Sequence, residues 1–209
     1  EQCPRHAPSR VAPRPRRPEA APLSRIEPSF DGVQDVLAEL AAIWRAGGTA
    51  GVGTVVRTFR SAPRQPGAAM VVAPDGSVSG SVSGGCVEGA VYESATEVAR
   101  TGLPRLERYG VSDDDALAVG LTCGGIVDVF VEPVSRANFG ELGTVIDDIA
   151  GHRPVAVATV ITHPDPSMVG RRLVIGPDTA AGTLGFDRAD AAVTDDARGL
   201  LAAGRSVVL

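Results

Sequence analysis

The sequence predicts an α/β fold with mixed sheets, built from two similar helix–strand–hairpin–helix–strand units. Helical and strand periodicities alternate along the chain, and turn signals rich in Gly and Pro separate them. The same order of elements then recurs after roughly a hundred residues, which is typical of an internal duplication. With 209 residues, 44% of them hydrophobic, the chain can bury one full domain or two small ones.

Three segments follow from this pattern. Residues 1–30 are rich in Pro and Arg and hold little that could be buried, so we expect a disordered tail. This tail is either a basic arm for an acidic partner or a solvated extension without function. Residues 31–135 form the first unit and residues 136–209 the second, which ends in the middle of an apolar strand signal. That ending predicts a truncation before a further domain.

In the first unit, each element has its own local signal. An acid followed three residues later by Gln opens a helix at Asp31, and Gly47–Gly48 ends it. The turn Pro74-Asp75-Gly76 lies between two short strand patterns and predicts a hairpin. The predicted elements are a helix over 31–46, strands at 51–58, 69–73 and 77–82, a helix at 87–100, and strands at 106–109 and 126–132.

The second unit repeats these signals. Thr54-Val55-Val56 corresponds to Thr159-Val160-Ile161, and Gly67 corresponds to Gly170. The predicted elements are a helix at 138–150, strands at 158–161 and 173–175, a helix at 189–203, and a strand that starts at Ser206. The chemically distinctive residues lie in the first unit and in the segment that joins the two units, so we expect the functional site there.

Composition excludes several classes of protein. The net charge of −5 and an aromatic content of 4% argue against a nucleic-acid-binding surface. No apolar run approaches the ~20 residues needed to span a bilayer, and no signal peptide is visible. Three cysteines without a secretory signal favour reduced thiols in the cytoplasm over a disulfide framework. The glycines of GVGTVV at 51–56 precede the strand residues, which does not match a dinucleotide-binding motif.

The strongest local signal is Ser83-Gly84-Gly85-Cys86-Val87-Glu88-Gly89. Gly84 and Gly85 precede a predicted helix, where backbone N–H groups and the helix dipole favour a bound anion. Cys86 lies at the first turn of this helix, where its sulfur offers a soft metal ligand or a nucleophile. The alternative is a tight turn with a small buried cysteine. Glu88 either orients Cys86, or acts as an acid, or only complements the helix dipole.

Two further signals share this chemistry. Cys123-Gly124-Gly125 precedes a strand, and its resemblance to the first context suggests one shared site in which the two sulfurs approach each other. The loop over 57–64 holds Arg57, Arg60 and Arg64, whose planar guanidinium groups suit phosphate or a ring edge. The alternatives are a buried cysteine and a solvated basic loop. Two cysteines are too few for a closed zinc site, which needs four ligands.

Together the three motifs resemble the XdhC/CoxI family of accessory factors for xanthine dehydrogenase and carbon monoxide dehydrogenase. The residues that carry this resemblance are SAPR-x-x-G with a following MVV (61–72), GSVSGGCVEG (80–89) and L-x-CGG-x-x-DV (121–129). Arg60 stands where the family commonly has Gly. The resemblance covers roughly residues 33–209 and describes an N-terminal domain without the Rossmann-like C-terminal domain of many members.

The resemblance implies a molybdenum cofactor (molybdopterin) chaperone rather than an enzyme. Such a protein binds the cofactor as cargo, protects it during sulfuration by a cysteine desulfurase-type sulfurtransferase, and delivers it to an apo molybdenum hydroxylase. The alternative is a sulfurtransferase that carries a persulfide on Cys86 or Cys123. We also consider a homodimer as an assembly of this chain. The predicted cofactor-binding residues, with the two cysteines as candidate ligands of molybdenum, are Arg57, Arg60, Ser61, Pro63, Arg64, Gly84, Gly85, Cys86, Glu88, Cys123, Gly124 and Gly125.

Overall fold

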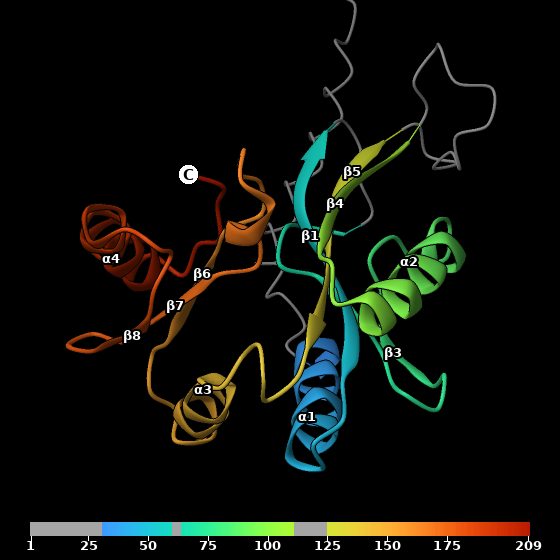
Figure 1. The fold of residues 1–209 in the computed structure, drawn as a ribbon, viewed down its shortest axis with the longest axis horizontal. Helices are drawn as coiled ribbons and strands as arrows, with labels where there is room; N and C mark the ends of the chain where they lie inside the picture. Colours follow the sequence, from blue (N-terminus) through green and yellow to red (C-terminus); the bar gives the residue numbers. More distant parts are fainter. Residues whose placement is uncertain (1–30, 60–63, 111–124) are drawn as a thin grey trace, which may run out of the picture.

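Two sheets with helices on both faces make up the structure, a computed structural model that describes residues 31–59, 64–110 and 125–209. The predicted tail at 1–30 therefore lies outside the described residues. The first sheet has five strands in the order β3-β2-β1-β5-β4, and the second has three in the order β6-β7-β8 (Figure 1). This mixed architecture confirms the predicted α/β fold class. Among the described residues, no helix has the length and apolar character that a membrane crossing requires.

The first sheet is antiparallel and centred on β1. The strands β1 (Ala50–Phe59), β2 (Ala69–Val72), β3 (Val78–Gly80), β4 (Arg105–Gly110) and β5 (Ile126–Val134) follow the predicted ranges closely. β1 pairs with β2 on one side and with β5 on the other, and the register with β5 shifts between Val55 and Arg57. The alternation of side chains along a strand gives this sheet two faces with different partners.

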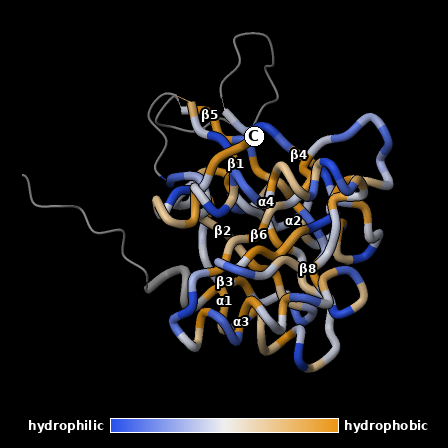
Figure 2. Tube along the Cα trace, turned by 90° about the vertical axis from the view of Figure 1, so that its left-hand side faces the viewer, coloured by the Kyte–Doolittle hydropathy of each residue, from blue (hydrophilic) through white to orange (hydrophobic). Residues whose placement is uncertain are grey.

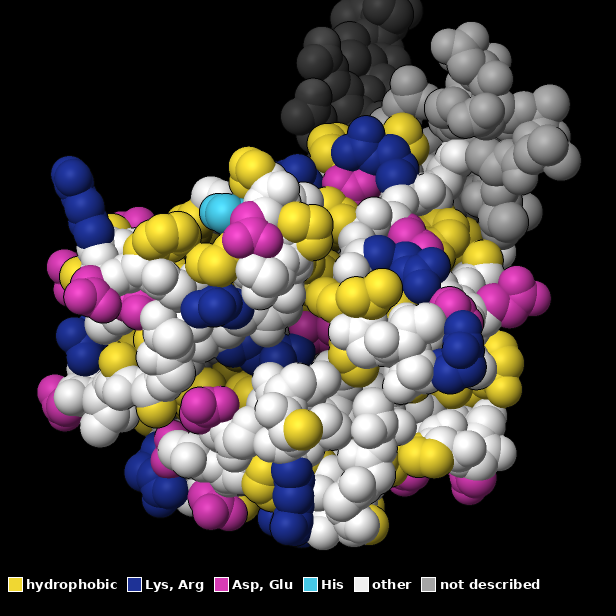
Figure 3. Space-filling view, viewed as in Figure 1, with side chains coloured by type: hydrophobic (Ala, Val, Ile, Leu, Met, Phe, Trp, Pro, Cys, Tyr) yellow, Lys and Arg dark blue, Asp and Glu magenta, His cyan; other side chains and the backbone are white. Residues whose placement is uncertain are grey.

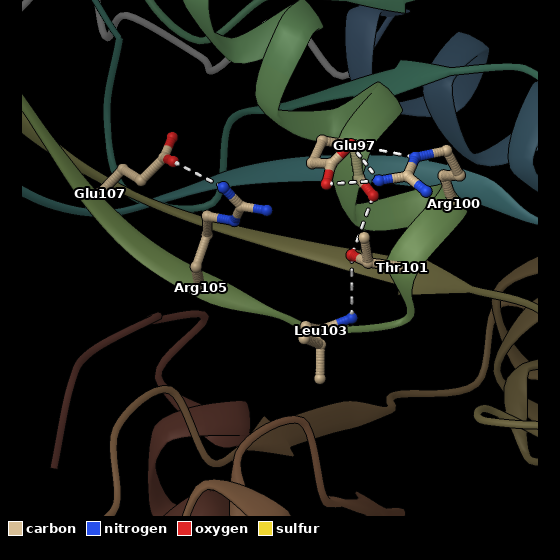
Figure 4. A network of polar contacts seen from close by, with 6 residues as sticks. All are labelled: Glu97, Arg100, Thr101, Leu103, Arg105 and Glu107. Carbon is tan, nitrogen blue, oxygen red and sulfur yellow. Dashed lines mark hydrogen bonds and ion pairs between the residues drawn. The ribbon is translucent and has the colours of Figure 1, made fainter.

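Helix α2 (Glu88–Thr101) covers one face of this sheet. Its buried residues pack against valines of β1 and β5 in one apolar cluster. A Cβ atom added at Gly51 would lie 2.2 Å from the carbonyl oxygen of Ala95, so the glycines of β1 permit the close approach of the helix. At the far end of α2, Glu97 pairs with Arg100, and β4 continues from there with Arg105 beside Glu107 (Figure 4).

The opposite face of the first sheet is covered by α1 (Asp31–Arg45) together with α3 (Leu142–Ala150). Both helices contribute to a second cluster that also includes residues of β1, β2, β5 and β7. Trp44 Nε1 donates to the carbonyl oxygen of Phe139 at 2.9 Å and so ties α1 to the turn that precedes α3. Figure 2, which looks through the stacked layers, shows hydrophobic stretches mainly in the central strands and helices and hydrophilic ones in the outer loops.

The second sheet holds β6 (Ala156–Thr159), β7 (Arg172–Ile175) and β8 (Ala180–Gly182), and α4 (Asp187–Ala202) packs on it. A 3-10 helix, η1 (Pro166–Met168), lies in the connection between β6 and β7. Val174 of β7 lies on the face of the second sheet opposite α4 and packs into the cluster formed by α1 and α3. The layers therefore run α2, first sheet, α1 with α3, second sheet, α4 (Figure 1).

The two units correspond down to individual backbone hydrogen bonds. Val55 N–H donates to the carbonyl of Ala68 and Gly67 N–H to that of Val55, both at 2.8 Å. In the second unit, Val160 bonds in the same way with Arg171 and Gly170, at 3.0 and 2.8 Å. The strands β6, β7 and β8 thus follow the order of β1, β2 and β3, and both units hold the same left-handed glycine, with φ of 98° at Gly67 and 87° at Gly170. These correspondences agree with a duplicated scaffold.

Two predicted elements differ from the structure. The helix predicted from Asn138 begins at Leu142, because the Asn138 side chain accepts from the Ser135 N–H at 2.8 Å and donates to the Pro133 carbonyl, which holds a turn instead. The predicted strand from Ser206 is wrong, since residues 205–209 form no strand. The strand at the corresponding position of the first unit is β4, which pairs only with β5. The described part of the second unit holds no counterpart of β5, so residues 206–209 have no such neighbour with which to pair.

Candidate functional site

Three motif-bearing loops leave the first sheet in the same direction. β1, β3 and β4 run parallel to one another, because each is separated from the next by one antiparallel strand. The loops that follow these strands begin at residues 60, 81 and 111, and the last one returns at Gly125 to start β5. We call this end of the sheet the motif edge, and its described residues are 57–59, 64–68, 81–88, 109–110 and 125–126. The topology thus brings together segments that are far apart in the sequence.

Side chains from all three segments pack on one apolar cluster under α2. Cys86 of the second motif lies against it with Ala68, which follows the first motif, and Tyr109, which precedes the loop of the third. Cys86 is half-buried, whereas Gly125 is buried where β5 begins. On this face, Cys86 therefore packs near residues adjacent to the other two motifs, and a shared site for the three motifs stays a prediction. Cys123 and Gly124 lie outside the described residues, so the predicted approach of the two sulfurs stays a prediction.

The loop before α2 is folded around the carboxylate of Glu88. This carboxylate accepts hydrogen bonds from the backbone N–H groups of Gly84 and Gly85 at 2.9 and 2.7 Å. It also accepts from the N–H groups of Ser83 and Val87, at 2.9 and 3.2 Å. The hydroxyl groups of Ser81 and Ser83 donate to it as well. The amides that the sequence assigns to a bound anion are therefore occupied by an anion of the protein itself.

These contacts determine the charge state of Glu88. Desolvation by burial raises its pKa, but the hydrogen bonds from Ser81 and Ser83 outweigh this effect and lower the pKa to about 2. The carboxylate is therefore ionised at any physiological pH. The loop is stabilised without a ligand, and the Cys86 N–H is held by the Ser83 hydroxyl at 3.0 Å. Of the roles considered for Glu88, these bonds favour the one in which it orients Cys86, by holding the loop that carries the cysteine.

On the opposite face, a row of charges crosses the sheet next to the motif edge. Arg57, Asp128 and Arg108 are register partners on β1, β5 and β4, so their side chains share a face. The buried carboxylate of Asp128 accepts hydrogen bonds from Arg108 Nε at 2.6 Å and from Arg108 Nη2 at 2.9 Å. The Arg108 guanidinium also lies 5.2 Å from the ring centre of Phe59. The sequence reasoning did not assign a role to Arg108 or Asp128, although Asp128 belongs to the third motif.

The predicted site residues thus divide between two faces. Arg57 is exposed on the face with Asp128, whereas Cys86 and Glu88 lie on the face covered by α2. Arg64 is exposed in the loop after β1. Arg60, Ser61 and Pro63 lie outside the described residues. In the described part of the chain, no group of three or more His, Cys, Asp and Glu side chains could hold a metal ion.

A model of the XdhC and CoxI family matches residues 43–110 and 149–209, more than half of the chain. The chain belongs to this family. The two matched segments coincide with the two units, and the first includes the cysteine loop with Cys86 and Glu88.

Individual relatives agree with the XdhC and CoxI assignment. The chain is 35% identical over 104 residues to the molybdenum cofactor insertion chaperone PaoD of Escherichia coli K12, which covers 50% of this chain and 32% of PaoD. It is 38% identical over 77 residues to the uncharacterized protein YqeB of the same organism, covering 37% of this chain and 14% of YqeB. The chain therefore spans a third or less of these curated relatives.

A solved structure shares the fold. This protein, described as a xanthine dehydrogenase from Bacillus halodurans, superposes with a TM-score of 0.57 and 27% identity. The match covers 71% of the present chain and 44% of that protein. The XdhC and CoxI fold seen here is therefore also known from crystallography.

Proposed function

We propose that this protein binds molybdenum cofactor, protects it while a cysteine desulfurase-type sulfurtransferase adds sulfur, and delivers it to an apo molybdenum hydroxylase of the xanthine dehydrogenase or carbon monoxide dehydrogenase type. The observation that carries the proposal is the convergence of three family motifs at one edge of the sheet. The relative PaoD, a molybdenum cofactor insertion chaperone, supports the choice of cargo.

The motif edge offers chemistry that suits each part of such a cargo. A thiolate at Cys86 is a soft ligand for molybdenum or for its sulfur, and Cys123 would add a second one. The exposed Arg57 and Arg64 can pair with a phosphate in a planar, bidentate manner. Gly84 and Gly85 contribute by their left-handed backbone, with φ of 79° and 118°, which lets the loop close around Glu88.

The test is release and assay of bound pterin from the protein purified from cells that make the cofactor. We expect cofactor in the parent protein, and weaker retention in Cys86→Ala and Arg64→Ala by roughly ten- to a hundredfold, as for the loss of one charge-assisted contact. Arg188→Ala is the matched control, because Arg188 is an exposed arginine of the second unit. Absence of cofactor from the parent, or equal retention by all variants, would contradict the proposal.

A second assay separates the chaperone from a sulfurtransferase. The purified protein is incubated with a cysteine desulfurase and cysteine, and persulfides are then labelled and mapped. A chaperone leaves the cysteines as thiols while the cofactor gains sulfur. A persulfide on Cys86 that passes to the cofactor would instead show that the protein itself transfers sulfur.

A further inference from the structure

A cleft of about 440 Å³ lies between the two sheets. The helices α1 and α3 fill one end of the space between the sheets, and the cleft occupies the other end, toward the motif edge (Figure 1). Thr54 and Phe130 line one wall, and Val157 and Val160 line the other. In Figure 3 the surface is hollowed between the two halves, with acidic and basic side chains inside the hollow. Its volume lies within the ~300–1,000 Å³ typical of small-molecule sites.

At the base of this cleft is the carboxylate of Glu132. Val127, Val129 and Val131 of β5 face α2, so the alternating residues Phe130 and Glu132 face the cleft. Arg172 of β7 reaches across from the second sheet and donates to Glu132 Oε2. Arg172 is held in turn by the carbonyl of Asn138 at 3.0 Å and by the ring of Phe139, whose centre is 4.5 Å away.

The second oxygen of Glu132, Oε1, borders the cleft. Among the described residues, Arg172 is the only side chain that bonds this carboxylate, and it uses Oε2. No buried side-chain nitrogen or oxygen of the described residues lacks a partner, so the unpartnered Oε1 is accessible from the cleft. An oriented acceptor in a mostly apolar cavity selects for a ligand that donates hydrogen bonds there.

The mouth of the cleft belongs to the first family motif. Arg57, Pro66 and Gly67 line the cleft, and all three lie at the motif edge. The remaining walls are largely apolar side chains of β6 and of the last residues of the chain, including Val207. The cleft therefore combines largely apolar walls from two sheets, an inner hydrogen-bond acceptor at Glu132, and the exposed guanidinium of Arg57.

We propose that the cleft between the two sheets holds the pterin ring of the cofactor, with Glu132 Oε1 accepting from ring N–H groups and Arg57 facing its phosphate. A pterin is a flat fused ring with an amino group and a ring N–H on one edge, which matches the cleft and its acceptor. This inference rests on the proposed function for the identity of the ligand. It goes beyond the proposed function because it places the pterin ring in the cleft. The cleft lies on the face of the first sheet opposite the face on which Cys86 and Glu88 lie.

Two ligands without metal or dithiolene test the cleft directly. Neopterin and neopterin monophosphate are titrated into the purified protein, and binding is followed by the fluorescence of the pterin. Glu132→Gln should weaken both by about tenfold, the effect of one charge-assisted hydrogen bond. Arg57→Ala should lower the affinity for neopterin monophosphate to that for neopterin, and it should leave the affinity for neopterin unchanged. 1,3-Dimethyllumazine has a ring of similar shape whose two N–H groups are replaced by N-methyl groups, so it should not distinguish the parent from Glu132→Gln.

Because Glu132→Gln also alters the contact with Arg172, a second variant leaves that pair untouched. Val157→Trp fills the cleft from β6 and should abolish binding of neopterin. Val78→Trp is the matched control, since Val78 is also an exposed strand valine, with 47% exposure against 41% for Val157. Thermal unfolding of each variant establishes that it is folded.

The outcomes separate the cleft from the proposed function. If the parent does not bind neopterin, or if Val157→Trp binds it as well as Val78→Trp does, the cleft proposal is overturned. Retention of molybdenum cofactor by the parent in that case leaves the proposed function intact. If the parent retains no cofactor, the proposed function fails, whatever the cleft binds.

Discussion

Ser81 donates its hydroxyl to Glu88 at 2.6 Å across seven residues, from the end of β3 to the first turn of α2. Thr183 donates to Asp190 at 2.6 Å across the same separation, from the end of β8 to the first turns of α4. The second unit thus keeps the bond that joins a hairpin to its following helix. It lacks the glycine pair and the cysteine, so the first unit elaborates a structural contact that both units share.

Substitution of these two carboxylates should therefore have unequal effects. Glu88→Gln places an amide group, which donates hydrogen bonds, among four backbone N–H donors, so we expect a loss of about 1–3 kcal/mol in the free energy of unfolding. Asp190→Asn should cost less, about 1 kcal/mol, because the carboxylate of Asp190 accepts, among the described residues, only from Thr183 and Leu184. Urea unfolding measures both, and equal losses would contradict this account.

The contribution of Glu88 should depend on pH in a defined direction. Its pKa is about 2 in the folded protein against 4.5 for a free side chain, so its carboxylate stabilises the fold above pH 4.5. This stabilisation is lost as the pH falls from 4.5 through about 2. Solvent screening at this half-buried site reduces it to about 1–2 kcal/mol. The difference in unfolding free energy between the parent and Glu88→Gln should shrink over this range and stay constant above it.

The approach of α2 to β1 predicts a strong effect at one glycine. Gly51→Ala would place a Cβ atom 2.2 Å from the Ala95 carbonyl oxygen, and the resulting shift of α2 should cost about 1–3 kcal/mol or more. Gly89→Ala is a matched change within α2, where an added Cβ meets nothing within 4 Å. It should stabilise the protein by about 0.5–1 kcal/mol through helix propensity. Thermal unfolding compares the two variants, and a Gly51→Ala protein as stable as Gly89→Ala would contradict the prediction.

Two arginine ion pairs should differ in their contribution to stability. Arg108→Ala leaves the Asp128 side chain, which is 3% exposed, without its bidentate partner, and we expect a loss of about 1–3 kcal/mol. Arg100→Ala removes a pair whose side chains are 71% and 44% exposed, so the loss should stay below about 1 kcal/mol. Chemical denaturation of the two variants compares them. Similar small losses would show that Arg108 does not compensate the buried carboxylate.

Sequence periodicity was sufficient for elements whose signals are local. The hairpin around Asp75 could be predicted because this side chain bonds the N–H and the hydroxyl of Ser77 within the turn itself. The strand expected from Ser206 was wrong, because a strand also needs a neighbour with which to exchange hydrogen bonds. The late start of α3 had a weak local signal in the side chain of Asn138, which competes with helical bonding.

The candidate site was predictable in part for the same reason. The cysteine loop was recognisable from adjacent residues, and Glu88 lies within it. The nature of its anion was not predictable, because a glycine-rich turn before a helix accepts an external phosphate or an internal carboxylate equally well. Only the bonds of Gly84 and Gly85 to Glu88 decide between them.

By itself, the sequence determined the elements, their repetition and the motifs of the XdhC and CoxI family, since all of these depend on residues close together in the chain. The tertiary structure alone decided which motifs meet and on which face each residue lies. It placed Glu132 of β5 opposite Arg172 of β7, forty residues away, and left one carboxylate oxygen open to the cleft. Such contacts depend on strand order and on how two sheets pack, and no local pattern of residue types encodes either.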